Sequence, residues 1–457
     1  MKFDRRRLVA ALAGAASATT AAPVFARDAT PAARETGRRT SIDASTLGLQ
    51  PNGSDDQSKA FQRAINSAAA AGAELRLAPG VYRGGGLTLP PHTAIAGVAG
   101  ATHVVLAAAS NMFTTTGSDY VSLNGLVLDG ANIPLPAQHG LVHLAQGRAL
   151  RITDCEIVNA GGPGIKLEGV QGDISGNTIG ASDTAIFCLD ARGVKISGNT
   201  VRSAGNNGIL VWRSTPGDDG TLVVDNRIEN VANKSGGSGQ YGNAINVFRA
   251  DNVIVRGNRI RNAAFSAVRG NTASNLQVID NSCTGLGEVA LYAEFAFQGA
   301  VIANNVVDGA AIGVSVTNFN DGGRLAVVQG NLIRNLVPRR PAGTDPNDDA
   351  GVGIGIEADT LVTGNLIENA PHAGITAGWG KYLRDVSITG NMVRTTGYGI
   401  TVSVAPGAGT TLITNNLIAG ARLGAIVGME WKKPVADLIQ EGAARYAQLS
   451  LSGNQVR

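Results

Sequence analysis

The chain has 457 residues and a formal net charge of +3, with 44% hydrophobic, 4% aromatic and 16% charged residues. The hydrophobic share argues against a disordered chain, and the 61 glycines, about twice the usual share, argue against long helices and coiled coils. Residues 1–26 contain four basic residues and one acidic residue and so account for the whole net charge. The remainder is neutral, which argues against a nucleic-acid-binding protein, because such a protein needs a basic surface.

Residues 1–26 have the pattern of an export signal. A basic start is followed by an apolar stretch and a small-residue exit that ends at Ala26, so we expect a signal peptide cleaved after Ala26. The run Arg5-Arg6-Arg7 favours the twin-arginine export machinery. No later run reaches the roughly 18 apolar residues of a membrane span. We therefore expect a periplasmic or secreted protein with a flexible leader over residues 27–40.

From residue 41 onward one short phrase recurs, apolar–x–apolar–x–Gly/Asp/Asn–Asn–x–apolar. The asparagine that follows the Gly/Asp/Asn position occurs in eleven copies, at Asn177, Asn199, Asn226, Asn258, Asn281, Asn305, Asn331, Asn365, Asn391, Asn416 and Asn454. Degenerate copies have Gly125 and Cys155 at this position. A second phrase, Gly/Ala–apolar–x–apolar, lies between the copies of the first. Short alternating runs separated by Gly and Asn are typical of strands. A repeat this short buries its apolar face only by stacking on its neighbours, which predicts a single-domain parallel β-helix over residues 41–457, with about 13 or more coils.

We expect the recurring asparagines, called the slot asparagines, to be structural. Each is expected at a turn in the left-handed conformation, with its amide bonding the copies above and below. Residues 41–100 are expected to form the N-terminal cap and the first coils. There, Ser54-Asp55-Asp56-Gln57 has a capping-box pattern that opens a helix with Phe61, Ala64, Ile65 and Ala68 on its apolar face. Residues 434–447 are expected to form a short amphipathic helix in the last coil.

Residues 43–100 resemble the entry of pectate-lyase-like and polygalacturonase-like β-helix proteins, on the segments NGSDD (52–56) and LAPGVY (77–82). The whole chain, with its twin arginines and Gly-Asn repeats, resembles the twin-arginine-translocated repetitive proteins, a family of unassigned activity. These resemblances imply a right-handed, pectin-lyase-like β-helix whose substrate lies along the strands of the second phrase. The polygalacturonase motifs Asn-Thr-Asp, Gly-His-Gly and Arg-Ile-Lys are missing, so any activity has to be argued from the residues themselves.

The outward positions of the second phrase are candidates for a site. Side chains alternate between the two faces of a strand. The residues one and three places after the first apolar residue of the second phrase are therefore expected to point outward. Polar, charged and aromatic residues concentrate at these positions between Asn246 and Glu357. Long inserts at residues 230–242 and 335–351 are expected to wall a groove over coils 245–354, because loops on a rigid scaffold commonly carry function.

Two kinds of chemistry fit these residues. Hydrolysis needs two carboxyls, and Glu294 and Glu357 occupy one outward column two coils apart, near the upper end of the spacing in inverting glycosidases. Lyase chemistry needs a base and a group that neutralises a uronate carboxyl, tasks that Arg269 and Tyr292 could share. Arginines hold carboxylates and indole rings stack on sugars. The candidate substrate-binding residues are Asn246, Arg249, Asn271, Trp212 and Trp379.

We predict no metal and no cofactor. The acidic pairs Asp218-Asp219 and Asp348-Asp349 are weak candidates for Ca²⁺, which needs six to eight oxygen ligands, and plain turns account for both pairs. The five histidines have no ligand spacing. Cys155, Cys188 and Cys283 occupy different registers of the repeat and are expected to be buried thiols, although an exported protein leaves one disulfide open.

Two functions remain open from the sequence. The first is an exported protein that binds, and as a lyase or glycoside hydrolase cleaves, an acidic polysaccharide. The second is a non-catalytic envelope or surface repeat protein with an adhesion or scaffold role. The polar columns and the paired inserts favour the first function, and the missing pectinase motifs favour the second.

Overall fold

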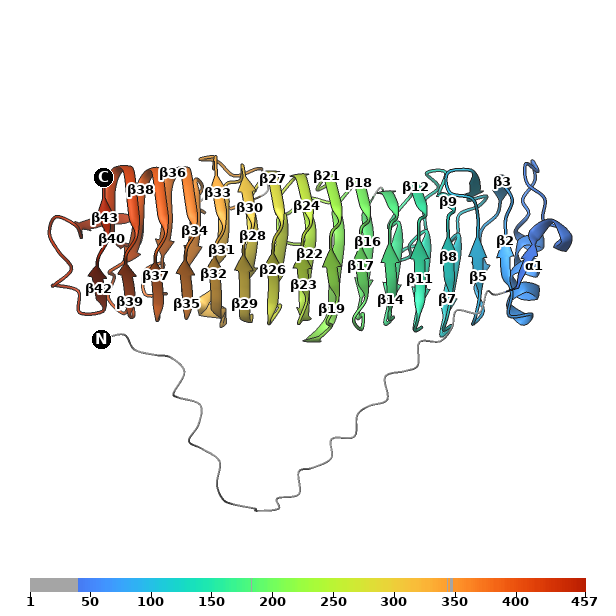
Figure 1. Cartoon of the computed structure of the whole chain (residues 1–457), viewed down its shortest axis with the longest axis horizontal. Coiled ribbons are helices and arrows are strands. Elements are labelled where there is room, and N and C mark those ends of the chain that lie inside the picture. Colours follow the sequence, from blue (N-terminus) through green and yellow to red (C-terminus); the bar gives the residue numbers. More distant parts are fainter. Residues whose placement is uncertain (1–39, 182, 343, 346–347) are drawn as a thin grey trace, which may run out of the picture. The chain divides into compact units, whose positions relative to one another are not determined.

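The computed structural model describes residues 40–457 except 182, 343 and 346–347, and Thr40–Arg457 form one compact unit. The expected signal peptide and the leader up to residue 39 lie outside the described residues. The unit is a right-handed parallel β-helix whose strands stack turn upon turn (Figure 1), which confirms the predicted fold class. None of the described helices has the length and hydrophobicity that a membrane crossing requires.

Each turn of the β-helix contributes strands to three faces. Face 1 is a sheet of 16 described strands: β1 (Ser41–Asp43), β2 (Glu74–Arg76), β5 (Ala94–Ala96), β8 (Ser122–Asn124), β11 (Leu150–Thr153), β14 (Gly172–Ser175), β17 (Lys195–Ser197), β20 (Leu222–Val224), β23 (Ile254–Arg256), β26 (Leu276–Ile279), β29 (Gln298–Ala303), β32 (Arg324–Gln329), β35 (Thr360–Thr363), β37 (Val386–Thr389), β39 (Thr411–Thr414) and β42 (Leu449–Ser452).

Face 2 follows the slot asparagines. It contains β3 (Gly80–Arg83), β6 (Thr102–Val105), β9 (Val127–Asp129), β12 (Glu156–Ala160), β15 (Thr178–Ala181), β18 (Thr200–Ala204), β21 (Arg227–Val231), β24 (Arg259–Ala263), β27 (Ser282–Leu286), β30 (Val306–Asp308), β33 (Leu332–Arg334) and β43 (Gln455–Val456).

Face 3 carries the second phrase. It contains β4 (Leu87–Thr88), β7 (Phe113–Thr116), β10 (Val142–Ala145), β13 (Ile165–Glu168), β16 (Thr184–Leu189), β19 (Asn207–Asp218), β22 (Asn243–Asp251), β25 (Val268–Asn271), β28 (Val289–Glu294), β31 (Ile312–Val316) and β34 (Val352–Ile356). Three long strands run across faces 2 and 3: β36 (Leu366–Ala377), β38 (Met392–Ser403) and β40 (Leu417–Glu430).

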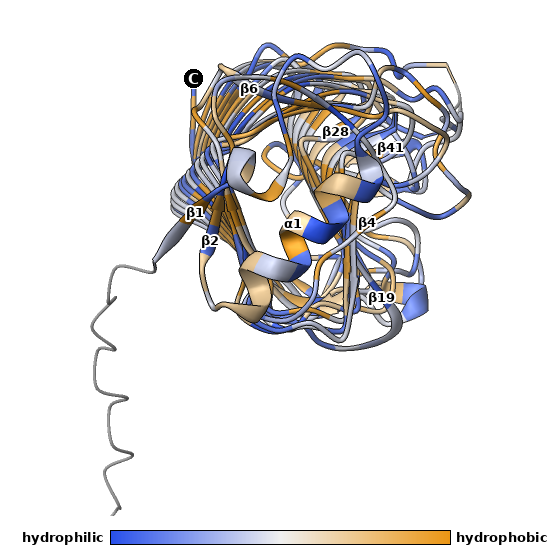
Figure 2. Cartoon of the chain, turned by 90° about the vertical axis from the view of Figure 1, so that its right-hand side faces the viewer, coloured by the Kyte–Doolittle hydropathy of each residue, from blue (hydrophilic) through white to orange (hydrophobic). Residues whose placement is uncertain are grey.

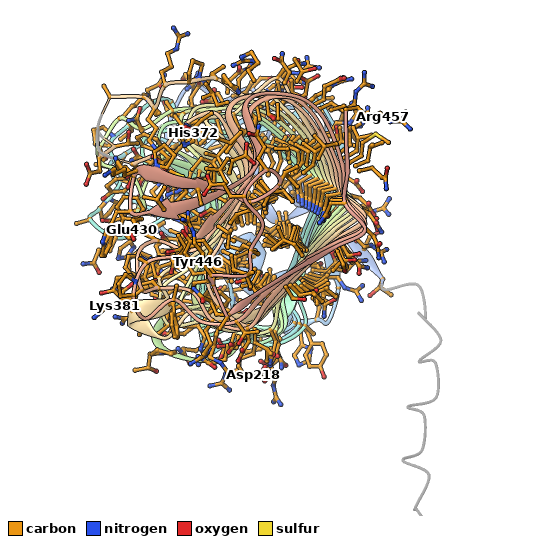
Figure 3. The ribbon with its side chains drawn as sticks, turned by 90° about the vertical axis from the view of Figure 1, so that its left-hand side faces the viewer. Asp218, His372, Lys381, Glu430, Tyr446 and Arg457 are labelled. Carbon is orange, nitrogen blue, oxygen red and sulfur yellow. The ribbon has the colours of Figure 1, made fainter. Side chains whose placement is uncertain are left out.

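Rows of aliphatic side chains fill the interior, repeated from turn to turn (Figure 3). Beside them runs a ladder of buried slot asparagines between faces 1 and 2. The main-chain N–H and the side-chain Nδ2 of Asn281 both donate to Oδ1 of Asn305, each at 3.0 Å, and Nδ2 also donates to the Val255 carbonyl. The same pattern joins successive slots from Asn177 to Asn454. The predicted ladder is confirmed.

The predicted left-handed conformation of the slot asparagines is wrong. The residue before each slot adopts it instead, for example Gly198 (φ 63°), Asp225 (φ 56°) and Asn304 (φ 57°). Gly, Asp and Asn tolerate positive φ best, which explains why these three residue types precede the slot. Because the preceding residue makes the corner, the slot asparagine is left free to direct its amide into the stack.

Helix α1 (Ser58–Ala70) closes the N-terminal end and lies across the opening of the β-helix (Figure 2). Its predicted apolar face is confirmed, since Phe61, Ala64, Ile65 and Ala68 are buried. The predicted capping box is not formed. Ser54 bonds Asp55, and it is Oδ1 of Asp56 that accepts the Ser58 main-chain N–H at 2.8 Å, so the helix begins later. The other described helical segments are the short 3-10 turns η1 (Ala44–Leu47) and η2 (Phe319–Asp321).

The helix predicted over residues 434–447 is absent. The chain instead turns back after β40 and forms β41 (Lys433–Asp437), which pairs antiparallel with β40. The reason is tertiary: β40 lies near the end of the stack, where β43 covers only Leu417 and Ile418. Pairing with the remaining main-chain groups of this edge overrides the local helical preference.

The ladder gives a first prediction. Replacing Asn305 by Asp keeps its shape but exchanges Nδ2, which donates to the Val278 carbonyl and to Oδ1 of Asn331, for an acceptor. The Val278 carbonyl loses the Nδ2 donor, Oδ1 of Asn331 keeps only the Asn305 main-chain N–H, and a charge is buried, so we expect a loss of about 3 kcal/mol or more in unfolding free energy. Guanidinium unfolding followed by circular dichroism measures it. Asn66→Asp, on the exposed side of α1, is the control and is expected to stay within about 0.5 kcal/mol. Equal losses for the two variants would contradict the role of the ladder.

Candidate functional site

Face 3 presents two outward columns of side chains. Strand register places Arg269 beside Tyr292 and Tyr292 beside Ser315 in the first column, and Asn271 beside Glu294 in the second. Residues between the two columns, such as Ala293, point into the core. Because neighbouring strands lie only about 4.8 Å apart, side chains of successive turns contact one another along each column.

A cavity of about 490 Å³ opens over the C-terminal part of face 3, between β28 and β40. Hydroxyl groups from the two columns line its floor: Tyr292, Ser315, Thr317, Thr376, Thr401 and Ser403. Carboxyl, cationic and aromatic residues complete the lining: Glu357, Asp348, Asp349, Arg340, His372, Trp379, Trp431 and Lys432. In Figure 3, His372, Glu430 and Lys381 lie on one side of the β-helix and Arg457 lies on the other. The cavity is a polar pocket with an aromatic part.

Glu357, directly after β34, is the lining carboxyl with the most distinctive surroundings. Its Oε2 accepts the main-chain N–H of Phe319 at 2.6 Å. Burial raises the pKa of Glu357 above its ordinary value of 4.5 and outweighs the opposing effect of the N–H groups of Phe319 and Asn318. The side chain therefore keeps its proton to a higher pH than an exposed glutamate does. A carboxylic acid of this kind beside a cavity is suited to donate a proton.

Two tryptophans lie together in the C-terminal turns. Trp379 follows β36 and Trp431 lies between β40 and β41; their ring centroids are 5.4 Å apart in an edge-to-face arrangement. Trp379 is 37% exposed and Trp431 is 49% exposed. The ammonium group of Lys432 lies 5.8 Å from the Trp379 ring centroid. Exposed indole rings beside a cation offer both a stacking surface and a charge to a bound molecule.

A buried ion cluster lies beside the cavity. Arg269 binds Glu294 through two hydrogen bonds of 2.7 and 2.8 Å and reaches Glu288 at 3.3 Å. Arg340 of the second insert binds the other oxygen of Glu288 at 3.0 Å, and burial raises the pKa of Glu288. Three of the four predicted catalytic residues meet here, since the Arg269 guanidinium also packs 4.8 Å from the Tyr292 ring centroid.

These contacts limit what the predicted catalytic residues can do. Glu294, with a side chain only 2% exposed, is occupied by Arg269 and by Nδ2 of Asn271. The Arg269 guanidinium is neutralised by two carboxylates, so it is poorly placed to hold a uronate. Burial raises the pKa of Tyr292, which keeps its phenol protonated and suits it to donate a hydrogen bond rather than to act as a base.

The two inserts behave differently: the first covers the middle of face 3, whereas the second covers it and also lines the cavity through Arg340, Asp348 and Asp349. In the first insert, the carbonyls of Gly239 and Gln240 accept hydrogen bonds from Nδ2 of Asn246, which buries this residue. In the second insert, Arg340 is pinned to Glu288. The cavity therefore overlaps the groove expected over coils 245–354 only in part: its lining begins at Tyr292 and reaches Lys432. Loop length indicated the inserts, but only their side-chain contacts decide which turns they cover.

The predicted substrate-binding residues are divided between two places. Trp379 lines the cavity, whereas Asn246, Asn271, Trp212 and Arg249 are not in its lining. Trp212 packs 4.8 Å from the Phe248 ring, and the Arg249 guanidinium lies 4.8 Å from the same ring.

Sequence reasoning missed Ser403, Trp431, Lys432 and His372 as lining residues. The signal available for the first three was the extra residues that follow the second phrase in the last coils.

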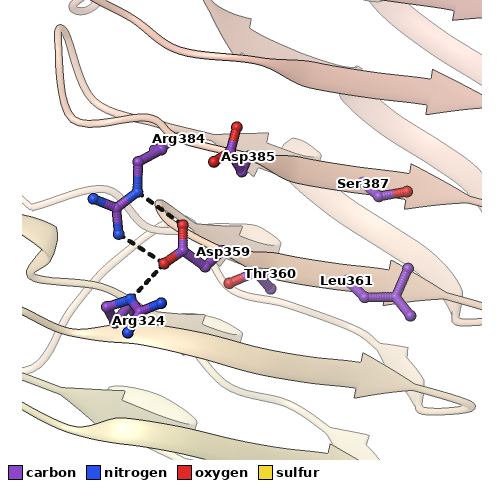
Figure 4. Close-up of a pocket in the computed structure, with 7 residues that line it drawn as sticks. All are labelled: Arg324, Asp359, Thr360, Leu361, Arg384, Asp385 and Ser387. Atoms are coloured by element: carbon purple, nitrogen blue, oxygen red, sulfur yellow. Dashed lines mark hydrogen bonds and ion pairs between the residues drawn. The ribbon is translucent and has the colours of Figure 1, made fainter.

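A second, wider hollow of about 910 Å³ lies beside face 1 (Figure 4). Arg384 and Arg324 both point at Asp359, and Arg384 binds it through two hydrogen bonds of 2.8 and 2.7 Å. Hydrogen bonds from Arg384 and Arg324 hold the pKa of Asp359 below its ordinary value. Because this carboxylate engages both guanidinium groups, the hollow is a weaker candidate than the cavity on face 3.

The ion cluster gives a second prediction. Arg269→Met leaves Glu294 without its buried partner, and we expect a loss of about 3–5 kcal/mol in unfolding free energy. Arg269→Met with Glu294→Leu removes both charges and is expected to recover a large part of that loss. Arg334→Met is the control, because the Arg334–Asp308 pair is half exposed and is expected to cost about 1 kcal/mol or less. Denaturant unfolding of the parent chain, the single variants Arg269→Met and Glu294→Leu, the double variant and the control tests this, and strictly additive losses would contradict a coupled pair.

Glu357 gives a third prediction, on pH. Its folded-state pKa is raised above 4.5, so the folded chain holds this proton more tightly than the unfolded chain. The resulting stabilisation is fully present below about pH 4.5 and is lost as the pH rises through the folded pKa. Relative to Glu357→Gln, which cannot ionise, the native chain is expected to lose stability over this rise. Denaturant unfolding at a series of pH values measures the difference. A difference that does not change with pH would contradict the raised pKa, and Glu368→Gln, at a half-exposed position beside Arg394, is the control.

Solved structures share the fold at low sequence identity. The catalytic unit of the thermostable GH87 alpha-1,3-glucanase from Streptomyces thermodiastaticus matches with a TM-score of 0.50 and 15% identity over 92% of this chain and 70% of that chain. The N-terminal fragment of gene product 12 from bacteriophage Phi29 matches with a TM-score of 0.53 and 16% identity, over 87% of this chain and 73% of that chain. No curated protein matches the sequence. At this identity the structures show a common fold alone.

The family whose profile matches is described as periplasmic copper-binding protein (NosD), which raises the question whether the residues that the structure describes can hold copper. They hold no group of three or more His, Cys, Asp or Glu side chains that fits a metal ion. Cys155, Cys188 and Cys283 are free and buried, and burial raises the pKa of each thiol, which opposes the thiolate that copper binds. The rings of His139 and His143 lie 4.8 Å apart, but His143 shares the Glu168 carboxylate with the Lys166 ammonium.

The described residues therefore do not fit copper, and we assign no chemistry to it. The membership itself rests on sequence. The profile matches residues 109–249 and 148–347, which together make up more than half of the chain. The chain belongs to the NosD family of periplasmic proteins.

Proposed function

We propose that the protein binds a polysaccharide in the cavity on face 3 and cleaves it with Glu357 as proton donor. One observation carries the proposal: a single cavity combines a carboxyl whose pKa is raised by burial, a floor of hydroxyl groups and two exposed tryptophans. Sugar rings stack on indole faces and their hydroxyls need several convergent hydrogen-bonding partners. This combination therefore fits a glycan better than it fits an apolar ligand.

In the proposed reaction Glu357 gives its proton to the glycosidic oxygen as the carbon–oxygen bond breaks. A water molecule then attacks the anomeric carbon and passes its proton to a carboxylate. Our sequence-based candidate for that carboxylate is Glu294, two turns away in the same column. Its bonds to Arg269 weigh against the role, which remains a prediction, and Asp349 is a carboxyl that lines the cavity itself.

The other candidate residues have supporting roles in this proposal. Tyr292 donates a hydrogen bond to the sugar, and Arg269, paired with Glu294, holds the phenol ring in place. Trp379 provides a stacking surface. The binding roles of Asn246, Arg249, Asn271 and Trp212 would require contacts outside the cavity and remain predictions.

We also propose that the glycan is acidic and that the protein meets it outside the cytoplasm. Arg340 and Lys432 in the lining support the first point. The description of the family as periplasmic and the twin-arginine pattern of residues 1–26 support the second. Passage through the twin-arginine machinery remains part of this proposal.

A non-catalytic adhesion or scaffold role is the second candidate function. The observation that favours it is the mutual neutralisation of Arg269 and Glu294. A two-carboxyl hydrolase needs both carboxyls within reach of the substrate, and one of the predicted pair is committed to an arginine.

A fourth prediction separates the two functions. We would incubate the purified protein with acidic and neutral polysaccharides and follow new reducing ends together with the absorbance of unsaturated uronates. We expect reducing ends without unsaturated products, and a loss of about 100-fold or more in Glu357→Gln, because removal of a general acid costs at least that. Glu368→Gln, which lies outside the cavity, is expected to retain activity.

The other outcomes are equally informative. Unsaturated products would show that the protein cleaves the glycan by elimination rather than by hydrolysis. Binding without any product would favour the adhesion or scaffold role. A folded protein that neither binds nor cleaves any glycan of the panel would refute the proposal.

A further inference from the structure

The tip between β40 and β41 is built differently from the rest of the solenoid. Every pairing of described strands is parallel except this hairpin, in which Val427 pairs with Asp437 and Glu430 with Lys433. Main-chain pairing would be enough to cover the edge of β40. The tip does more, because its two residues Trp431 and Lys432 both line the cavity on face 3.

The position of the tip is set by contacts with the cavity wall. The Trp431 ring lies against Gly380, where a Cβ atom would come within 2.4 Å of the ring, so only glycine fits there. The Gly380 carbonyl accepts a hydrogen bond from Oγ of Ser403, which belongs to the cavity floor. Floor, turn and hairpin tip are thus joined by direct contacts.

Packing of the hairpin alone does not account for this arrangement. Side chains that serve only to fasten two segments are normally buried, whereas Trp379 and Trp431 remain 37% and 49% exposed. The charged residues of the same turns, Lys381, Glu430, Lys432 and Lys433, are exposed and mainly basic. The acidic lining residues Glu357, Asp348 and Asp349 belong to other turns. An anion therefore meets its most favourable surroundings at the hairpin tip.

We propose that Trp379, Trp431 and Lys432 form a subsite for one acidic sugar, in which an indole ring packs on the sugar and the Lys432 ammonium pairs with its carboxylate. This inference rests on the proposed function and adds two points to it: the glycan contains uronic acid, and its carboxylate is recognised at the hairpin rather than at Arg269. Lys432 then determines specificity without taking part in bond cleavage.

The experiment compares charged and uncharged forms of the same sugar chain. Short oligomers of galacturonic, mannuronic and glucuronic acid are titrated as free acids and as methyl esters, in a Glu357→Gln background that prevents turnover. Tryptophan fluorescence is a direct readout, because two of the three tryptophans of the chain lie in this subsite. Calorimetry gives an independent dissociation constant. Lys433→Ala is the matched control, since Lys433 is the next basic residue and does not line the cavity.

We expect Lys432→Ala to weaken binding of a free-acid oligomer by about three- to fivefold, the scale of a solvent-exposed ion pair, and to leave its methyl ester unaffected. Added salt is expected to weaken acid binding in the parent chain more than in Lys432→Ala. Trp379→Ala is expected to weaken both forms, and Lys433→Ala neither.

Three results would overturn the inference. They are unchanged acid binding in Lys432→Ala, equal losses for acid and ester in Lys432→Ala, and the same effect from Lys433→Ala. In each case the parent chain, which carries Glu357→Gln, still binds the oligomers, so only the proposed subsite is refuted. If the folded parent chain binds no oligomer in either form, the subsite and the proposed function fall together.

Discussion

The ladder of buried asparagines is the constraint on which the rest of the structure depends. Each slot amide ties its own turn to the next through main-chain and side-chain donors, for example from Asn281 to Asn305. A buried amide that loses these partners is costly, so turns are held in register even where the inserts between them differ in length. Residues far apart in sequence, such as Asn331 and Asn365, therefore occupy equivalent positions.

That register is what brings the candidate site together. Because the turns stay aligned, the outward residues of face 3 form continuous columns, and Tyr292, Ser315, Gly355 and Thr376 follow one another along the cavity floor. The inserts then decide which part of the floor is open. Arg340 and the carbonyls of the first insert close the centre, and the turns around Trp379 and Trp431 leave the C-terminal part accessible.

The family relation and the site point in different directions. The family is described by copper binding, yet the described residues hold no group fit for a metal, and the cysteines are dispersed and buried. The stacked turns depend on the inward-facing residues, whereas the outward-facing residues do not hold the stack together. The same solenoid fold can therefore carry unrelated sites. The cavity lined by hydroxyls, a carboxyl whose pKa is raised by burial and indole rings favours a sugar ligand over a metal ion.

Much of the fold was available from the sequence alone, because a repeat that cannot bury its own apolar face has to stack, and this applies to each copy from Asn177 to Asn454. The ladder, the face of α1 and the outward columns all followed from local periodicity. The closure of the centre, the pairing of Arg269 with Glu294 and the hairpin that replaces the helix at 434–447 did not. Each depends on contacts between segments distant in sequence, such as Arg340 with Glu288 or Trp431 with Gly380. Local pattern determines which way a side chain points, but only the folded chain decides what it meets there.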